Sequence, residues 1–330
     1  MIDLAAGVRV NRYTIVKEIG EGGMQKVYLA EDTILGRYVA LKTPKNKSAE
    51  KRFHRSAVLA SKVNHPNVAK TLDYFTDGER EYLTEEFIDG VDLDQALLSH
   101  YTSVDPYLTA KLFHNLSKAL SASHHVNVIH RDLKPSNIMV LGGLSATGVK
   151  ITDFGISKMA GDEIDEAAKN GQGSITTSQT AMGALPYMAP EIIRSLGQVS
   201  KPSDIWALGA MMFRILTGEY PFGIGYMAIP GILSGKHIPY PKFITSNKQF
   251  EPLANELIKI IEACLVSDPD ARPTADELVS MCGLLCYPVC DREVGVIGDT
   301  RMAYGFIRVA NQPQVFFHYD SVYGKKPFSQ

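Results

Sequence analysis

The sequence predicts an α+β protein in which short strands come first and helices follow. Residues 12–16 (RYTIV) alternate in the manner of a half-buried strand, and they run into a glycine-rich stretch at residues 20–28 (GEGGMQKVY). Residues 107–126 instead carry apolar side chains at helical spacing, such as Leu112 and Leu116. Because 45% of the 330 residues are hydrophobic, the chain can bury a large core, and we expect one bilobal unit or two domains.

The charge and hydropathy of the chain argue against two classes of protein. The formal net charge is -2, so we do not expect a strongly basic nucleic-acid surface, although a local basic patch stays open. No apolar run approaches the roughly 18 residues of a membrane-spanning helix. The first ten residues, MIDLAAGVRV, lack the basic region and apolar core of a secretory signal. We therefore expect a cytoplasmic protein that does not enter a membrane.

The chain has four cysteines, and three of them follow one another at four-residue steps, which would place them on one helix face. We expect them to be small buried hydrophobic residues. A zinc site is the alternative, but it would need a fourth ligand that the sequence does not place nearby. The four are Cys264, Cys282, Cys286 and Cys290.

One loop carries the residue types that phosphoryl transfer needs, at residues 130–137 (HRDLKPSN). The carboxylate of Asp132 can accept a proton from an attacking hydroxyl group, and the ammonium of Lys134 can offset charge on the transferring phosphate. Asn137, five residues after the aspartate, can bind Mg²⁺ through its amide oxygen. We therefore predict that this loop is the catalytic loop.

A second carboxylate, Asp153, directly follows the alternating run at residues 149–152. A flexible glycine, Gly155, comes two residues later, as a metal-binding strand end requires. The order HRDLKPSN, then DFG at residues 153–155, then APE at residues 189–191 strongly resembles the eukaryotic-like protein kinases, of the bacterial Ser/Thr type. Three motifs in one order are far more specific than any one tripeptide.

This resemblance implies the bilobal protein kinase fold over about residues 10–285. The small, mainly-β lobe would span about residues 10–88, and the large, mainly-α lobe about residues 89–285. The implied activity is transfer of the γ-phosphate of ATP, with Mg²⁺, to Ser or Thr hydroxyl groups of protein substrates. Lys134 in HRDLKPSN favours Ser/Thr over Tyr acceptors.

The resemblance also assigns roles to single residues. Asp132, Lys134 and Lys42 would be catalytic, and Asn137 and Asp153 would bind the metal. The residues expected to bind ATP come from the glycine-rich loop, from the strand at residues 39–42 (VALK), and from the strand and hinge at residues 81–90: Gly20, Gly22, Gly23, Val27, Ala40, Lys42, Glu85, Glu86 and Ile88.

Three positions depart from the family pattern. Gln25 replaces the third glycine of the loop, which should make the loop stiffer there. Ser56, in the predicted helix at residues 50–63, stands where the family has the Glu that pairs with the strand Lys. Ala184 replaces a Thr that bridges the catalytic Asp and Lys. These departures leave a rival hypothesis open, namely a nucleotide-binding pseudokinase that serves as a regulatory or scaffolding module.

Glu85 falls at the gatekeeper position, which is usually apolar. A carboxylate at the back of a nucleotide pocket is costly unless it is paired, and the nearest expected cation is Lys42. We therefore predict a relocated ion pair in which Glu85 anchors Lys42 in place of the helix glutamate that Ser56 replaces. Two alternatives are that Glu85 turns toward solvent, or that the register slips by one residue and places Glu86 there.

Two further pairs in the large lobe are expected from the resemblance. Asp204, in the apolar helix at residues 203–209, should hold the backbone of the catalytic loop, and Arg272 should pair with Glu191 as a structural ion pair. His124, at the end of the helix before the catalytic loop, is expected to be a helix-end residue without a catalytic role.

The polar stretch at residues 159–180 is expected to be the activation segment. Phosphorylation of its hydroxyl cluster, including autophosphorylation, would supply a partner for Arg131 and order the segment. A homodimer could provide this modification in trans. The alternative to a regulated segment is a solvated loop with incidental hydroxyl groups. The cluster comprises Ser174, Thr176, Thr177, Ser178 and Thr180.

The C-terminal segment, residues 291–330, has a different pattern. It contains three short strand-like runs, and two of them, at residues 304–308 and 315–319, resemble the paired aromatic motifs of cold-shock domains. A full barrel of this kind needs five strands, so we expect a partial cold-shock or OB-like β segment. Its aromatic residues would either bind single-stranded nucleic acid or pack against the kinase or a partner. The four candidate residues are Tyr304, Phe306, Phe316 and His318.

Overall fold

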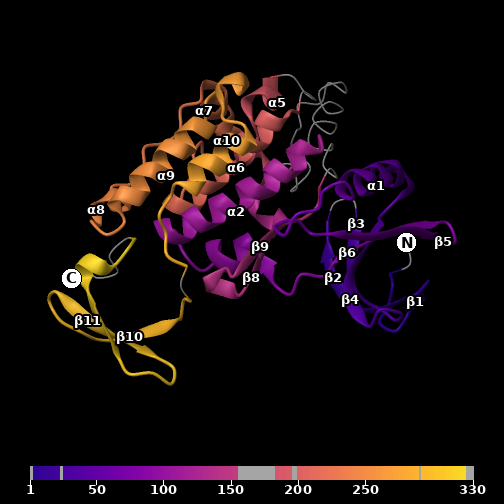
Figure 1. Cartoon of the computed structure of the whole chain (residues 1–330), viewed down its shortest axis with the longest axis horizontal. Helices are drawn as coiled ribbons and strands as arrows, with labels where there is room; N and C mark the ends of the chain where they lie inside the picture. Colours follow the sequence, from indigo (N-terminus) through magenta and orange to yellow (C-terminus); the bar gives the residue numbers. More distant parts are fainter. Residues whose placement is uncertain (1–2, 23–24, 155–182, 195–198, 290, 325–330) are drawn as a thin grey trace.

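The structure is a computed structural model with a small β lobe, a larger helical lobe and a C-terminal sheet (Figure 1). It describes residues 3–22, 25–154, 183–194, 199–289 and 291–324. The predicted α+β class and the order of the two lobes are confirmed.

The small lobe is a six-stranded antiparallel sheet with one helix. The strands lie in the order β1-β2-β3-β4-β6-β5. Side chains alternate between faces, and one face buries a cluster that includes Tyr13, Ile15 and Leu41. The elements are β1 (Arg9–Val10), β2 (Tyr13–Glu21), β3 (Gln25–Asp32), β4 (Arg37–Pro44), α1 (Lys47–Ala60), β5 (Thr71–Asp77) and β6 (Arg80–Glu86).

Helix α1 packs on the other face of this sheet. Phe53 and Ala57 of α1 bury themselves against Leu83 of β6. Ser56 is also buried, because positions 53, 56 and 57 of a helix share one face. The face that should carry the family's glutamate therefore points toward the sheet, but it carries a serine.

The large lobe is built around α6 (Lys201–Thr217), which is buried along most of its length because it is apolar on nearly every side. The longest of the described helices, α2 (Pro106–His125), begins at Asp105, whose side chain accepts hydrogen bonds from the N–H groups of Tyr107 and Leu108. The other helices that the structure describes in this lobe are α5 (Pro190–Arg194), α7 (Ile229–Ser234), α8 (Phe243–Ser246), α9 (Glu251–Cys264) and α10 (Ala275–Gly283).

Short elements complete the described part of this lobe. A three-stranded antiparallel sheet consists of β7 (Val91–Asp92), β8 (Ile138–Leu141) and β9 (Gly148–Ile151). The single-turn elements are η1 (Asp94–Leu98), η2 (Pro135–Asn137), η3 (Gly143–Ser145), η4 (Leu185–Tyr187), η5 (Gly225–Ala228) and η6 (Pro269–Ala271), and a further turn, η7 (Tyr319–Ser321), lies in the C-terminal segment.

The C-terminal segment forms three antiparallel strands, as predicted: β10 (Gly295–Thr300), β11 (Tyr304–Val309) and β12 (Val315–His318). Figure 1 shows this sheet, in yellow and orange, beside the large lobe and far from the small lobe. Within the described residues it remains a three-stranded sheet with open edges, so the likeness to a cold-shock barrel is not confirmed.

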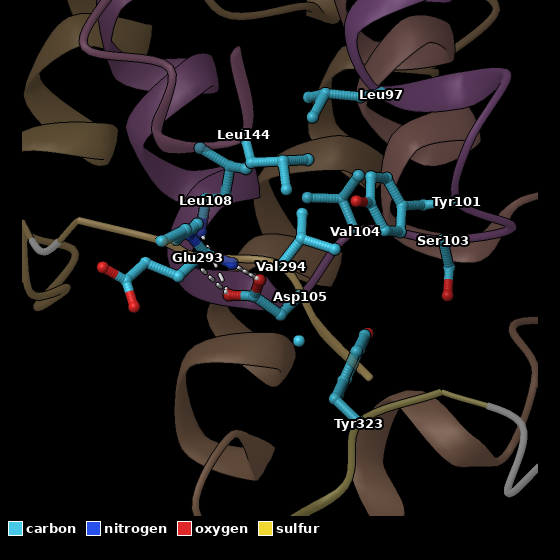
Figure 2. A pocket seen from close by; sticks show the side chains of 12 residues that line it. Leu97, Tyr101, Ser103, Val104, Asp105, Leu108, Leu144, Glu293, Val294 and Tyr323 are labelled. Carbon is cyan, nitrogen blue, oxygen red and sulfur yellow. Dashed lines mark hydrogen bonds and ion pairs between the residues drawn. The ribbon is translucent and has the colours of Figure 1, made fainter. Parts of the chain in front are cut away.

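Contacts at both ends of the C-terminal segment fix it to the large lobe. Arg292 forms a two-point ion pair with Asp105, with one contact of 3.0 Å between Nη2 and Oδ1. The ring of Tyr323 packs edge-on against Phe243 and Phe250, with ring centroids 5.7 and 5.1 Å apart. Between these contacts lies a pocket of about 480 Å³ whose wall includes Asp105 and Tyr323 (Figure 2).

The cysteines behave differently from one another. Cys264 and Cys282 are buried, as predicted, but Cys286 is exposed and that prediction is wrong. The reason is that α10 ends at Gly283, so Cys286 no longer lies on a helix face that points into the core. Cys290 lies outside the described residues. In the described part of the chain, no three His, Cys, Asp or Glu side chains are grouped to hold a metal ion.

None of the described helices combines the length and the apolar character that crossing a membrane requires.

The predicted ion pair between Glu191 and Arg272 is confirmed. Arg272 donates from Nη1 and Nη2 to the two carboxylate oxygens of Glu191, each over 2.8 Å, and its side chain is fully buried. Its guanidinium group also lies over the ring of Trp206. Burial alone would raise the pKa of Glu191, but the hydrogen bonds from Arg272 hold this pKa below its usual value. The pair therefore stays charged inside the large lobe.

Replacing Arg272 with Met should lower the free energy of unfolding by about 3–5 kcal/mol, because Glu191 would remain buried without its partner. Urea denaturation followed by circular dichroism measures this change. Lys259→Met is the matched control, since Lys259 pairs with Glu256 on an exposed face of α9, and its effect should stay below about 1 kcal/mol. Equal stability of the two variants would contradict a structural role for the buried pair.

Candidate active site

The register of two strands decides where Glu85 points. Ala40 of β4 pairs with Glu85 of β6, and Lys42 lies two residues after Ala40, so Lys42 and Glu85 share one face as diagonal neighbours. Nζ of Lys42 lies 2.6 Å from Oε2 of Glu85, and both side chains are about 5% exposed. The predicted contact is confirmed. Both alternatives are wrong, because Glu86 points the other way and pairs with Lys150.

Ser56 contributes no partner to Lys42. The residue is 3% exposed, and its hydroxyl has no hydrogen-bond partner among the described residues. The Lys42 ammonium instead has a second carboxylate partner, Oδ1 of Asp153, at 2.8 Å. Burial would lower the pKa of Lys42, but Asp153 and Glu85 together raise it above its ordinary value. The ammonium therefore remains charged between the two lobes.

The catalytic loop brings its three predicted residues together. Nζ of Lys134 lies 2.9 Å from Oδ2 of Asp132. Nδ2 of Asn137 donates to the backbone oxygen of Asp132 over 2.7 Å and to its Oδ2 over 3.1 Å. Asn137 therefore uses its nitrogen to orient the aspartate, and within the described residues its Oδ1 keeps no recorded partner.

A buried carboxylate on α6 fixes the backbone of this loop. Asp204 accepts hydrogen bonds from the N–H groups of His130 (2.9 Å) and Arg131 (3.0 Å), which confirms the predicted role of Asp204. It also bonds Nε2 of His124 over 2.9 Å. Arg131 has φ = 73°, a left-handed conformation that a residue with a side chain adopts only where its surroundings enforce it. His124 is buried and supports the loop, a role that its position at a helix end did not reveal.

His130 links the catalytic loop to the strand end that carries Asp153. Its Nε2 bonds the backbone oxygen of Thr152 over 2.9 Å, while Nδ1 accepts the N–H of Asp132 over 3.3 Å. Only the tautomer with the proton on Nε2 satisfies both contacts. The ring also packs edge-on against Phe154. Asp153 itself has φ = 60°, so each half of the site contains one residue in the left-handed conformation.

The residues predicted to bind nucleotide line the opposite, small-lobe side. Gly20 pairs with Val27 across the β2–β3 hairpin, and the N–H of Gly22 donates to the backbone oxygen of Gln25 over 2.9 Å. Gly23 lies outside the described residues. Ile88 is buried just after β6, and its backbone N–H has no acceptor in the described part of the chain. The hinge therefore offers a free donor.

The side of the loop where an acceptor would enter is hollow. A pocket of about 380 Å³ is lined by Lys134, Ser136, Gly183 and Tyr187, among others. Ala184 is nearly buried beside it and, having no hydroxyl, cannot make the bridge between Asp132 and Lys134. The hydroxyl cluster expected in the activation segment, Ser174 to Thr180, lies outside the described residues.

Sequence reasoning missed the contacts of Lys42 with Asp153 and of His124 with Asp204, and it missed a further contact made by Gln25. The amide of Gln25 donates to Oδ1 of Asp153 over 2.9 Å. The prediction for Gln25 concerned only the stiffness of the loop. No local pattern could have revealed the contact, because the two residues are separated by 128 positions.

Comparisons with known proteins agree with this geometry. The family described as protein kinase domain matches residues 13–282. The probable serine/threonine-protein kinase PknB of Lactococcus lactis is 34% identical over 76% of this chain and 38% of its own length. The serine/threonine-protein kinase PrkC of Bacillus subtilis is 32% identical over 82% of this chain and 40% of its own length. The chain thus spans about two fifths of these relatives.

Solved structures show the same architecture. A crystal structure of Rad53 in complex with AMP-PNP superposes with a TM-score of 0.63 at 26% identity, covering 82% of this chain and 64% of that chain. The kinase domain of Mycobacterium tuberculosis PknI gives a TM-score of 0.61 at 20% identity, covering 86% of this chain and all of that domain, and this likeness concerns the fold alone. With a matching family over most of its length and relatives above 30% identity, the chain belongs to the protein kinase family.

Proposed function

We propose that this chain is a Ser/Thr protein kinase that transfers the γ-phosphate of ATP to hydroxyl groups of proteins. The observation that carries this proposal is the meeting of Asp132, Lys134 and Asn137 opposite the pair of Lys42 and Asp153. These are the five groups that orient an acceptor hydroxyl and balance phosphate charge in this chemistry. The relatives' names as serine/threonine-protein kinases support it.

Each residue has a role that follows from its position. The Asp132 carboxylate, held by Asn137, would orient the acceptor hydroxyl and take its proton. Lys134, 2.9 Å from that carboxylate, would offset charge on the γ-phosphate, and Lys42 would bind the α- and β-phosphates. Adenine would lie against Ala40 and the hinge, where the free N–H of Ile88 can donate to it.

The side chains present fit a magnesium ion. Mg²⁺ prefers oxygen ligands, and Oδ1 of Asn137 and the carboxylate of Asp153 supply them. Burial would raise the pKa of Asp153, but Lys42 and Gln25 hold this pKa below its usual value, so the ligand is already ionised. When bound, the ion would balance the charge of the phosphates.

The pseudokinase hypothesis rests on Ser56, Gln25 and Ala184. The contact between Glu85 and Lys42 removes the first objection, because the strand lysine keeps a buried acidic partner. The missing bridge at Ala184 would affect the positioning of the acceptor more than the binding of ATP. We therefore favour an active enzyme. Three further expectations stay predictions: its location in the cytoplasm, its autophosphorylation and its homodimer.

Asp132→Asn should reduce phosphate transfer from γ-labelled ATP by about 10²–10⁴-fold, because the proton acceptor is lost, while nucleotide affinity stays close to the wild type. Transfer to a generic protein substrate and binding of a fluorescent ATP analogue measure the two effects. A wild-type protein that binds the analogue but transfers no phosphate would establish the pseudokinase instead.

Glu85→Met should weaken ATP binding or turnover at least about tenfold, because Lys42 would lose its buried anchor. Adding Ser56→Glu to this variant should restore part of the loss, since Ser56 lies on the face of α1 that packs on the sheet. Glu81→Gln is the matched control, because Glu81 lies on the same strand and face but does not contact Lys42. Unchanged activity of Glu85→Met would contradict the anchoring role.

The C-terminal sheet supports a second function, the binding of single-stranded nucleic acid. Tyr304, Phe306 and Phe316 form a cluster with ring centroids 5.4 to 6.0 Å apart, and Phe316 is 58% exposed. The recorded contacts of the segment with the large lobe run through other residues, such as Arg292 and Tyr323, and this leaves the rings accessible. Exposed rings on one sheet face are platforms on which bases can stack.

Phe316→Ala should weaken the binding of a labelled oligonucleotide by about 1–3 kcal/mol, because one stacking partner is removed. Fluorescence anisotropy at low and at raised salt measures this, and affinity should fall as salt rises. Val315→Ala is the control, since the neighbouring side chain lies on the opposite face of β12 and is also exposed. If the wild type does not bind at low salt, the rings serve packing against a partner instead.

A further inference from the structure

The side chain of Gln25 joins the glycine-rich hairpin to the large lobe. Gln25 is the first residue of β3 and is paired with Pro44 of β4. The residue is only 7% exposed, and its Nε2 reaches Oδ1 of Asp153, 2.9 Å away. The two lobes are therefore connected inside the cleft by an amide at a position where the family resemblance predicts a glycine.

The oxygen that Gln25 binds already has another donor. Oδ1 of Asp153 also accepts from Nζ of Lys42 over 2.8 Å, whereas the one contact recorded for Oδ2 within the described part of the chain is the hydroxyl of Thr152 at 3.4 Å. Hydrogen bonds to an ionised carboxylate are stronger than those between neutral groups. The amide thus binds Oδ1, the carboxylate oxygen that Lys42 also binds.

This arrangement leaves the other end of the amide unsatisfied. Oε1 of Gln25 is buried and has no hydrogen-bond partner among the described residues. A buried acceptor without a partner is unfavourable, so the side chain gains from any rearrangement that supplies a hydrogen-bond donor to this oxygen. The Gln25 side chain can therefore gain a hydrogen bond at Oε1 when it leaves this position.

A divalent cation at Asp153 changes the balance of these contacts. The positive end of the Gln25 amide and a bound cation repel each other at the same carboxylate oxygen. If Lys42 leaves Asp153, it loses one of its two carboxylate contacts but keeps Glu85 at 2.6 Å, whereas no second acceptor for the Gln25 N–H is recorded among the described residues. A cation that binds Oδ1 of Asp153 therefore displaces the amide from this oxygen.

We propose that Gln25 is an interlobe clasp: its amide holds Asp153 while no divalent cation is bound, and a complex of a divalent cation with a nucleoside triphosphate displaces it. This inference rests on the proposed function, in which Asp153 binds the metal. The clasp makes nucleotide binding depend more steeply on the metal than it would with glycine at this position. It makes Gln25 a positioning residue, which acts through Asp153.

A magnesium titration of nucleotide binding tests the clasp. Gln25→Leu keeps the volume of the side chain and removes the donor, and Gln25→Gly restores the family residue. With a fluorescent, non-hydrolysable ATP analogue, both variants should reach half-maximal binding at about tenfold lower Mg²⁺, the effect of losing one hydrogen bond to a charged group. Affinity measured in EDTA should not change.

The control is Glu31→Gln, which places an amide at the far, exposed end of the same strand and should leave the titration unchanged. An unchanged or increased magnesium requirement in both Gln25 variants would overturn the clasp. Phosphate transfer distinguishes this failure from failure of the proposed function, because an active enzyme with an unshifted titration contradicts only the clasp.

Hydrogen exchange in the nucleotide-free protein gives a second readout that does not need the metal. Backbone amides at residues 19–22 and 25–28 should exchange faster in Gln25→Leu than in the wild type, because the hairpin loses its contact with Asp153. Exchange at the wild-type rate would show that the amide does not hold the lobes together, and would overturn the proposal on its own.

Discussion

The buried ammonium of Lys42 is the group on which the site depends. It lies between two carboxylates, Glu85 from its own lobe and Asp153 from the other, and removing it from water is unfavourable unless both contacts are made. One positive charge shared by two negative charges leaves the cluster short of one cation. Burial raises the pKa of Glu85, and the negative charge of Asp153 raises it further. The shortage of positive charge prepares the site to receive a cation.

Anchoring Lys42 from a strand differs physically from anchoring it from a helix. The partners lie on β4 and β6, which are hydrogen-bonded neighbours in one sheet, so the distance between them is set by the ladder. A helix packed on that sheet can shift as a body, whereas two paired strands cannot shift relative to each other without breaking the ladder. In this chain a shift of α1 therefore does not determine where Lys42 lies. Helix α1 contributes apolar packing through Phe53 and Ala57.

Structural features could be predicted from the sequence wherever a local rule determined them. The contact between Glu85 and Lys42 could be predicted because strand parity and the cost of an unpaired buried carboxylate point to the same partner. The three tail strands followed from alternation, but alternation says nothing about how many strands close a barrel. His124 could not be recognised as a support because its partner Asp204 lies 80 positions away and reaches it only through the packing of α2 on α6. The contact of Gln25 with Asp153 depends in the same way on how the lobes close.

One helix connects the tail to the catalytic loop. At its start, Asp105 caps α2 and also binds Arg292 of the C-terminal segment, so one carboxylate serves the helix and the tail. Near its end, His124 bonds the Asp204 that holds His130 and Arg131. A helix of 20 residues is about 30 Å long. The attachment of the tail and the support of the catalytic loop therefore lie at opposite ends of the same helix.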